Sequence, residues 1–271
     1  MSQKVKEKLA KLFSLEDKVI LLTGAAGGIG SELAKGLAEI GADMALCDRD
    51  ETGLAAVKAE IAAQGDSAEC FSLDLLKMDS IKQCVQAVVE KFGKIDVLIN
   101  CAGINKRDGC LDADEETYDR IMGVNLKGAF FLSQEVAKQM MAVKTGSIIN
   151  VASYNAVMML GGCGVYGASK SGVAAMMRAQ AIEWAQYGIR SNALAPGHIS
   201  TPLTAPLWND PERSSFLLQR IAMERSGTPQ DLLGMVILLA SDASAYMSGQ
   251  LYVVDGGCLA GGKPWHYDTK Y

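Results

Sequence analysis

Short apolar runs, each followed by glycine or a polar residue, recur along the whole chain. Runs of this length without a polar face are typical of strands that are buried on both sides, as in a parallel sheet. Stretches with helical spacing separate most of them, and alternation of strands and helices predicts a parallel sheet covered on both faces. We expect seven strands, at residues 18–23, 44–47, 68–73, 95–99, 147–151, 190–194 and 251–254.

Longer stretches with apolar residues at helical spacing predict the helices that cover this sheet. We see no linker and no tandem repeat, so a single α/β domain over residues 15–258 is expected. One expected helix ends near residue 40, and another begins near residue 52. Two more span 81–92 and 117–141, and a further one carries the segment 166–170 and ends at about 187.

Residues 1–14 precede the first strand as a separate segment. Val5, Leu9, Leu12 and Phe13 share one helical face among lysines. This pattern predicts a short docking helix or a mobile arm, and a membrane-surface helix is the alternative.

The first strand ends in a glycine-rich turn at residues 24–30, and a helix follows. Strand, glycine turn and helix in this order favour a dinucleotide-binding turn. We interpret Gly24 as the sharp turn, Gly28 as the point where the backbone approaches a pyrophosphate, and Gly30 as the contact between helix and strand. The helix N-terminus would offer free N–H groups to the phosphates. The expected cofactor contacts here are Gly24, Gly27, Gly28, Ile29 and Gly30.

An acidic residue, Asp48, closes the second strand about 20 positions after Gly28. A carboxylate there accepts hydrogen bonds from the adenosine ribose hydroxyls and repels a 2′-phosphate. Because position 27 is glycine rather than a cation, we expect NAD rather than NADP as the cofactor. Arg49 argues the other way, since its guanidinium could reach a 2′-phosphate. The alternative role for Asp48 is to cap the helix that begins near Thr52.

The stretch from Ser153 to Lys170 holds the most reactive combination of side chains. Tyr166 and Lys170 are four residues apart, so on a helix they share a face. A neighbouring ammonium favours the phenolate and would lower the pKa of the tyrosine, which is about 10 for a free side chain. A tyrosine tuned in this way can move a proton to or from an alcohol or carbonyl oxygen. The alternative is an exposed aromatic side chain beside a solvated lysine.

Composition narrows the classes of function. Hydrophobic residues make up 49% of the 271 residues, enough for a sizeable core. A net charge of −5 disfavours nucleic acid and anionic membranes as partners. The seven cysteines are odd in number and form no C-x-x-C motif, which favours free thiols in a cytoplasmic protein. With only two histidines, no metal site is expected. The lysine-rich start has no signal-peptide pattern, and no apolar run reaches membrane-spanning length.

In combination, these motifs resemble those of the short-chain dehydrogenase/reductase family, whose fold is a single-domain, doubly wound Rossmann fold. The resemblance covers about residues 15–258, in the family's order and spacing. Cys101 stands where the family often has a second asparagine, on a segment that acts mainly through its backbone, so we expect no loss of activity. The matching motifs are Thr23-Gly-x-x-x-Gly-Ile-Gly30, Asn100-Cys-Ala-Gly103, Asn125, Ser153, Tyr166-x-x-x-Lys170 and Pro196-Gly197.

The resemblance implies hydride transfer between a nicotinamide cofactor and an alcohol or ketone carbon. Tyr166 would be the acid/base, and Lys170 would lower its pKa and hold the nicotinamide ribose. Ser153 would hydrogen-bond the reacting oxygen, and Asn125 would position a water in a proton relay. Taken singly, Ser153 could be a loop cap and Asn125 a satisfied polar group of a helix.

Further cofactor contacts are implied by position in the family. Asp74 and Leu75 would flank the adenine, while Ile199 and Thr201 would close on the carboxamide and pyrophosphate. The segment 200–223 would be a substrate lid, and the chain would form a homotetramer. Other implied contacts are Asn100, Ala102, Gly103, Tyr166, Lys170, Pro196 and Gly197.

Within the family, three segments are most similar to gluconate 5-dehydrogenases and related sugar-acid or polyol dehydrogenases: 13–18, 102–107 and 183–189. Arg107 could hold a substrate carboxylate with two hydrogen bonds, next to Ser153 and Tyr166. The alternative is a solvated arginine beside Asp108.

The C-terminal segment 259–271 runs past the usual end of the family and contains three aromatic residues and a histidine. We hypothesise that it folds over an active site, its own or a neighbour's. The alternative is a disordered tail or one that only packs.

Two other functions remain open. A 3-oxoacyl thioester reductase of the same family would favour NADPH and a basic surface for an acidic carrier protein, which Asp48 and the net charge disfavour. A dinucleotide-binding scaffold without catalysis would have no need of Ser153, Tyr166 and Lys170 together.

Overall fold

Seven parallel strands form the single sheet of the computed structural model, which describes residues 2–263. The strand order is β3-β2-β1-β4-β5-β6-β7, so the direction of winding reverses between β1 and β4. The predicted doubly wound parallel sheet is confirmed, with strand ends shifted by one or two residues. The strands are β1 Val19–Thr23, β2 Asp43–Asp48, β3 Ala68–Ser72, β4 Val97–Asn100, β5 Gly146–Val151, β6 Ile189–Pro196 and β7 Leu251–Val254.

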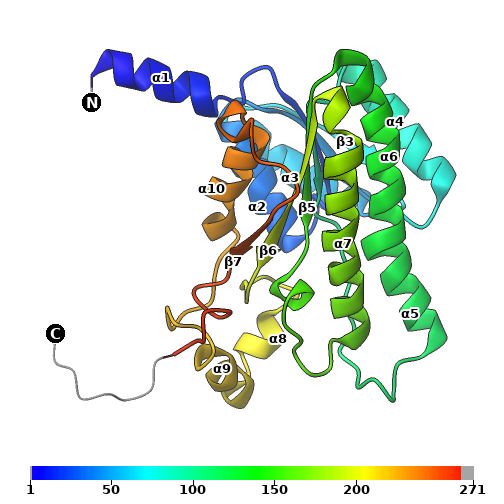
Figure 1. The fold of residues 1–271 in the computed structure, drawn as a ribbon, viewed down its shortest axis with the longest axis vertical. Coiled ribbons are helices and arrows are strands. Elements are labelled where there is room, and N and C mark those ends of the chain that lie inside the picture. The colour runs from blue at the N-terminus through cyan, green and yellow to red at the C-terminus, as the bar shows by residue number, and fades with distance from the viewer. Residues whose placement is uncertain (1, 264–271) are drawn as a thin grey trace.

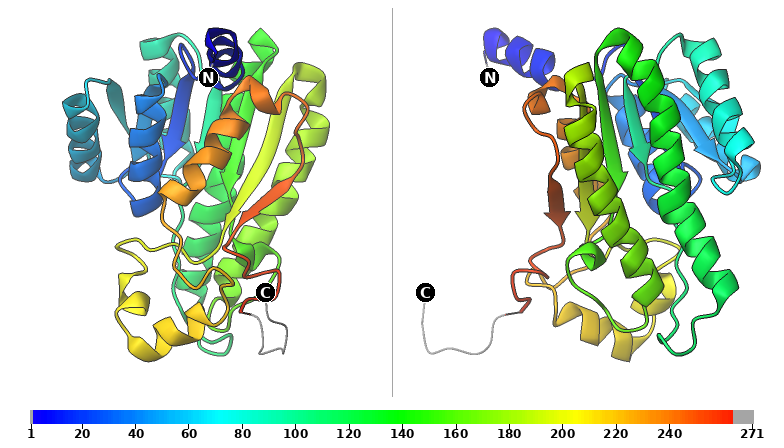
Figure 2. Two further views of the ribbon diagram at one scale, coloured as in Figure 1. Left: turned by 90° about the vertical axis from the view of Figure 1, so that its left-hand side faces the viewer. Right: turned by 45° about the vertical axis from the view of Figure 1, so that its right-hand side comes forward.

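Helices cover both faces of the sheet because successive side chains of each strand point to opposite faces. In β1, Ile20 and Leu22 belong to the core on one face, and Val19 and Leu21 belong to the core on the other. The first face carries α2 (Gly28–Glu39), α3 (Glu51–Ala63) and α10 (Gln230–Ala240); the second carries α4 (Met78–Phe92), α6 (Ala129–Val143) and α7 (Gly164–Glu183) (Figures 1 and 2).

Two long helices differ from their sequence prediction. The stretch expected at 117–141 is α5 (Glu115–Met122), a π-helical segment η1 (Gly123–Gly128) and then α6. The helix expected to reach about 187 ends as an α-helix at Glu183, and its last turn is a 3-10 helix, η3 (Ala185–Tyr187). Gly188, at φ +72°, then turns the chain into β6.

The N-terminal segment forms α1 (Gln3–Phe13), which extends away from the body of the molecule (Figures 1 and 2). Val5, Leu9, Leu12 and Phe13 are all exposed. A docking role for this helix remains a prediction. None of the helices described is long and apolar enough to cross a membrane.

The segment 200–223 lies beyond the carboxyl ends of the strands, where it forms α8 (Ala205–Trp208) and α9 (Pro211–Leu218) (Figure 1). The start of the predicted tail packs beside it: Lys263 donates its backbone N–H to the Gln219 carbonyl at 3.2 Å and pairs with Glu224 at 3.1 Å. The rest of the tail, 264–271, lies outside the described residues, and so does the hypothesis about it.

Candidate active site

The glycine turn between β1 and α2 has the shape of a phosphate-binding turn. Gly24 adopts φ +70°, and a Cβ there would lie 2.8 Å from Cα of Ala102, so only glycine fits. A Cβ on Gly30 would overlap the carbonyl oxygen of Gly24. The N-cap of α2 is Gly27, which supplies no side-chain acceptor. The first N–H groups of α2 can therefore bind the phosphates of a dinucleotide.

A groove of about 380 Å³ lies along the carboxyl ends of β1 to β4, next to this turn. It passes the switch point of the sheet, which is where doubly wound folds bind dinucleotides. Most of the predicted cofactor contacts line it: Gly24, Gly27, Gly28, Ile29, Gly30, Asp48, Arg49, Asp74, Leu75, Ala102, Gly103 and Thr201.

Asp48 is tied to the glycine turn. Its carboxylate accepts the N–H of Ala26 at 3.2 Å and that of Asp50 at 3.1 Å. The alternative role of helix cap is wrong, because the N-cap of α3 is Asp50, which accepts the N–H of Gly53 at 3.0 Å.

Asn100 and Pro196 are not part of the groove wall. The side chain of Asn100 is buried, and its Nδ2 donates to Ser133 Oγ at 2.8 Å and to Asn150 Oδ1 at 2.9 Å. The sequence prediction also gave no role to the Thr23 hydroxyl, which accepts N–H groups of the segment after β4. Those donors are Cys101 and Ala102, both at 3.1 Å, so Cys101 acts through its backbone as expected.

The candidate catalytic side chains meet in a pocket that adjoins the groove. Ser153 follows β5, and Tyr166 and Lys170 lie on α7; all three line the pocket, which has a volume of about 210 Å³. Lys170 Nζ lies 5.8 Å from the centre of the Tyr166 ring and donates to the Val151 carbonyl at 2.7 Å. The residues shared by pocket and groove are Ile29, Cys101, Gly103, Ile104 and Leu203.

Asn125 lies in the π-helical segment η1 and is almost fully buried. Its Oδ1 accepts the N–H of Ile104 at 2.8 Å, and its Nδ2 donates to the Ile104 carbonyl at 2.9 Å and to Ser169 Oγ at 3.0 Å. The side chain therefore ties the segment after β4 to the helix that carries Tyr166 and Lys170.

Comparisons with known proteins agree with this geometry. A family model described as enoyl-(acyl carrier protein) reductase matches residues 24–258. A 2-dehydro-3-deoxy-D-gluconate 5-dehydrogenase of Escherichia coli is 41% identical over 92% of this chain and 98% of its own. A 3-oxoacyl-[acyl-carrier-protein] reductase of Thermotoga maritima is 39% identical over 90% of this chain and 99% of its own. The crystal structure of a gluconate 5-dehydrogenase from Burkholderia cenocepacia in complex with NADP and tartrate superposes with a TM-score of 0.90 at 34% identity, covering 93% of this chain and 99% of that one.

The chain belongs to the short-chain dehydrogenase/reductase family. The predicted family is thus confirmed, and with it the class of reaction: the chain is a dinucleotide-dependent oxidoreductase acting on CH–OH groups. The alternative of a scaffold without catalysis is set aside.

Burial acts on the protonation of two candidate catalytic side chains of this short-chain dehydrogenase. It raises the pKa of the Tyr166 phenol, although a hydrogen bond with Ser153 acts in the opposite direction. It also lowers the pKa of Lys170 to about 8. That the lysine makes the phenol more acidic stays a prediction, because burial and the Ser153 hydrogen bond are the larger influences on the phenol in this structure.

The pocket also contains side chains that the sequence prediction missed. Arg107 does line it, as expected, and in the described chain Asp108 pairs with Lys106 at 2.8 Å rather than with the arginine. The missed polar side chains are Asn105, Tyr154, Asn155, His198, Thr204 and Trp208. They carry no motif of their own, but each follows a strand end or lies in the segment 200–223, where this short-chain dehydrogenase was expected to bind its substrate.

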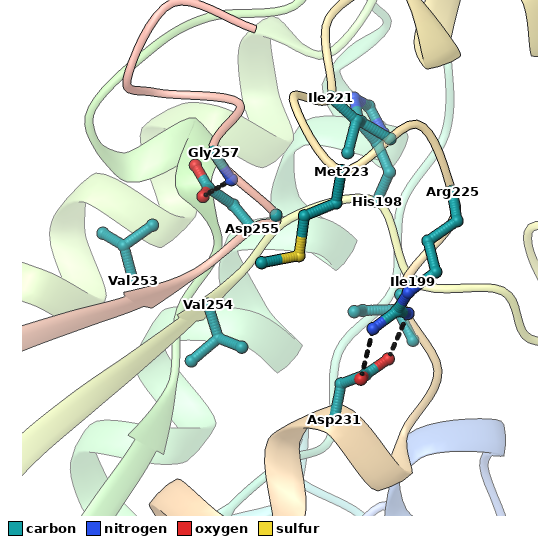
Figure 3. Close-up of a pocket in the computed structure, with 12 residues that line it drawn as sticks. His198, Ile199, Ile221, Met223, Arg225, Asp231, Val253, Val254, Asp255 and Gly257 are labelled. Carbon is teal, nitrogen blue, oxygen red and sulfur yellow. Dashed lines mark hydrogen bonds and ion pairs between the residues drawn. The ribbon is translucent and has the colours of Figure 1, made fainter. Parts of the chain in front are cut away.

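A further cavity, separate from the groove and from the pocket beside Tyr166, is lined by His198 and lies between the end of β7 and the start of α10 (Figure 3). Figure 3 shows Arg225 and Asp231 facing each other, with two contacts of 2.8 Å, and Asp255 turned back onto Gly257, whose N–H it accepts at 2.9 Å. The carboxylates of this cavity, Asp231 and Asp255, thus already have hydrogen-bond partners within the chain. The pocket beside Tyr166 is the better candidate for substrate. No cluster of three or more metal-ligating side chains occurs in the described part of the chain.

Proposed function

We propose that this chain oxidises a secondary alcohol of a sugar acid with NAD⁺ and reduces the corresponding keto acid with NADH. The observation that carries the proposal is the junction of the two cavities: the pocket that holds Ser153, Tyr166 and Lys170 opens into the dinucleotide groove. A substrate carbon in the pocket would thereby lie beside the cofactor.

In the oxidation, the Tyr166 phenolate takes the proton of the substrate hydroxyl, while Ser153 hydrogen-bonds the same oxygen. A bound nicotinamide would supply the hydride acceptor and a positive charge that favours the phenolate. Lys170 would hold the nicotinamide ribose, and Asn125 would order the water through which the proton leaves. In the reduction, the phenol donates its proton to the carbonyl oxygen.

We propose NAD as the preferred cofactor. Support comes from the Asp48 carboxylate at the groove wall, which would accept ribose hydroxyls and repel a 2′-phosphate. Arg49, an exposed neighbour, and the NADP in the Burkholderia cenocepacia relative favour the other cofactor. Because the carboxylate is hydrogen-bonded to the glycine turn and the arginine side chain is exposed, we give the carboxylate the greater weight.

The substrate class is supported by Arg107. It is exposed, lines the pocket, and has no ion pair within residues 2–263. A guanidinium in this position suits bidentate binding of a carboxylate. The names of the relatives agree, since one acts on a sugar acid and another binds tartrate, a hydroxylated acid.

A 3-oxoacyl thioester reductase is the second candidate. The observation that favours it is the similarity to the Thermotoga maritima reductase and to the matching family model. It requires an acyl chain in a pocket that contains several polar side chains, and for this reason we place it second.

Turnover measurements test the proposal. Purified protein is screened by NADH absorbance against sugar acids, polyols, simple secondary alcohols and a 3-oxoacyl thioester, with NAD(H) and with NADP(H). We expect activity on sugar acids that the Tyr166→Phe variant loses. Turnover that survives this substitution, or activity confined to the thioester, would contradict it.

The homotetramer and the cytoplasmic location remain predictions. Light scattering of the purified protein would measure the first.

A further inference from the structure

The pocket beside Tyr166 contains buried polar atoms without partners. Within the described residues, Asn105 Oδ1, Asn155 Oδ1 and Trp208 Nε1 accept or donate no hydrogen bond. Asn155 is only 5% exposed. Proteins rarely leave buried polar groups unpaired, because each such group costs about 1–3 kcal/mol. Since all three side chains line the pocket, a ligand bound there is the partner that we consider for these atoms.

Local contacts hold the backbone of Asn155 and the side chain of Asn105 in place. The backbone N–H of Asn155 donates to Ser153 Oγ at 3.1 Å, which fixes it next to the reacting position. Nδ2 of Asn105 donates to Cys163 Sγ at 3.8 Å, and Oδ1 of the same amide is left as a free acceptor.

The third side chain, Trp208, is the end of a row of aromatic rings that also contains Tyr154 and His198. The Tyr154 hydroxyl and His198 Nε2 are 3.2 Å apart, and the Trp208 ring lies edge-on to the imidazole with 6.3 Å between ring centres. Burial, with the charges of Arg107 and Arg220, lowers the pKa of His198 to about 4, and burial raises the pKa of Tyr154. Near neutral pH the row is therefore uncharged.

We propose that Asn105, Asn155 and Trp208 recognise the non-reacting hydroxyl groups of a polyhydroxylated substrate. This inference rests on the proposed function and names the residues that would select the substrate. A hydroxyl both donates and accepts, so a chain of hydroxyls matches two free acceptors and one free donor. An acyl chain would leave all three unsatisfied.

Because Asn105, Asn155 and Trp208 carry no charge, binding of the substrate's carboxylate and recognition of its hydroxyls fall to different residues. Arg107 would bind the carboxylate of the substrate, while the neutral groups would distinguish a sugar acid from any other acid of equal length. Sites built to hydrogen-bond a hydroxyl discriminate strongly against analogues that lack it, because their own polar groups are then left unpaired.

Two substrates of equal carbon length test the inference. D-Gluconate carries hydroxyls along the chain, and 5-hydroxyhexanoate carries only the one that would react. We expect the wild type to prefer gluconate by at least about 100-fold in kcat/KM. Trp208→Phe keeps an aromatic ring but removes the N–H, and Asn155→Leu keeps the branched shape but removes the acceptor. Each should lower kcat/KM for gluconate about 10-fold or more and leave that for 5-hydroxyhexanoate within about twofold.

Trp184→Phe is the matched control, since Trp184 packs under the sheet outside the pocket and should leave both substrates unaffected. Fluorescence titration with NADH should give the same Kd for all variants, which separates substrate recognition from cofactor binding. Equal losses on both substrates, no loss in either variant, or a wild type without preference would overturn the inference and leave the dehydrogenase intact. A wild type whose activity is confined to the 3-oxoacyl thioester, or that turns over nothing in the panel, would overturn the proposed function, and the inference would fall with it.

Discussion

Replacing Lys170 with methionine should stabilise the fold while abolishing turnover. The side chain is 3% exposed, and burial lowers its pKa from 10.5 to about 8. At pH 7 the lysine is therefore kept protonated in surroundings that disfavour its charge. Methionine has a similar length and is apolar, so it fits the same space without that penalty.

The size of the effect follows from the pKa. A change from 10.5 to about 8 corresponds to about 3 kcal/mol of unfolding free energy at pH 7. Loss of the hydrogen bond from Nζ to the Val151 carbonyl offsets about 1–1.5 kcal/mol of this. The variant should thus be more stable by about 2 kcal/mol. Because the folded-state pKa lies below the unfolded one, the wild type gains stability as pH rises from about 8 to 10.5, and the difference should vanish near pH 10.

Urea unfolding followed by tryptophan fluorescence at pH 7 and at pH 10, at one protein concentration, measures this difference. Lys138→Met is the control: this exposed lysine pairs only with Glu135 at 2.7 Å, so its loss should change stability by less than about 0.5 kcal/mol at either pH. A Lys170→Met variant that is less stable than the wild type at pH 7, or equally stabilised at both pH values, would refute the reasoning.

Two further predictions concern recognition. Arg107→Ala should raise KM for sugar acids about 10-fold or more and change KM for neutral polyols far less. Lys106→Ala is the control and should leave both KM values unchanged, because Lys106 is already paired with Asp108 and Asp114. Steady-state kinetics on both substrate types measure this, and an equal rise in KM on both would contradict the prediction. Asp48→Ala should raise the ratio of kcat/KM with NADP to kcat/KM with NAD about 10-fold or more. Asp50→Ala is the control: it removes the cap of α3 and should leave this ratio unchanged. An unaltered ratio in Asp48→Ala would show that the carboxylate does not select the cofactor.

The fold could be predicted because a parallel sheet buries both faces of every strand, which leaves an apolar run for each strand in the sequence. The π-helical segment around Asn125 could not, since residues 123–128 have an ordinary helical pattern. Its extra residue per turn is stabilised by contacts with Ile104 and Ser169, which come from elsewhere in the chain.

The dinucleotide groove and the pocket beside Tyr166 also differ in how far the sequence predicts them. The dinucleotide groove is formed by backbone at strand ends, where glycine and one acidic residue are required, so its sequence is recognisable. The pocket beside Tyr166 is formed by side chains such as Asn155 and His198, which become neighbours only through the fold. The burial that raises the pKa of the Tyr166 phenol was also out of reach, because it depends on how the chain folds and not on a local motif.

Asn125 shows how these parts depend on each other. By bonding both backbone groups of Ile104, it holds the segment after β4 close to α7, and a Cβ on Gly103 would then lie 3.2 Å from Lys170 Nζ. The same amide contacts Ser169, whose hydroxyl donates to the Tyr166 carbonyl at 2.7 Å. One buried side chain therefore sets the distance between the wall of the cofactor groove and the helix that carries Tyr166, the candidate acid/base. Positioning of this kind is what these contacts contribute to the proposed reaction.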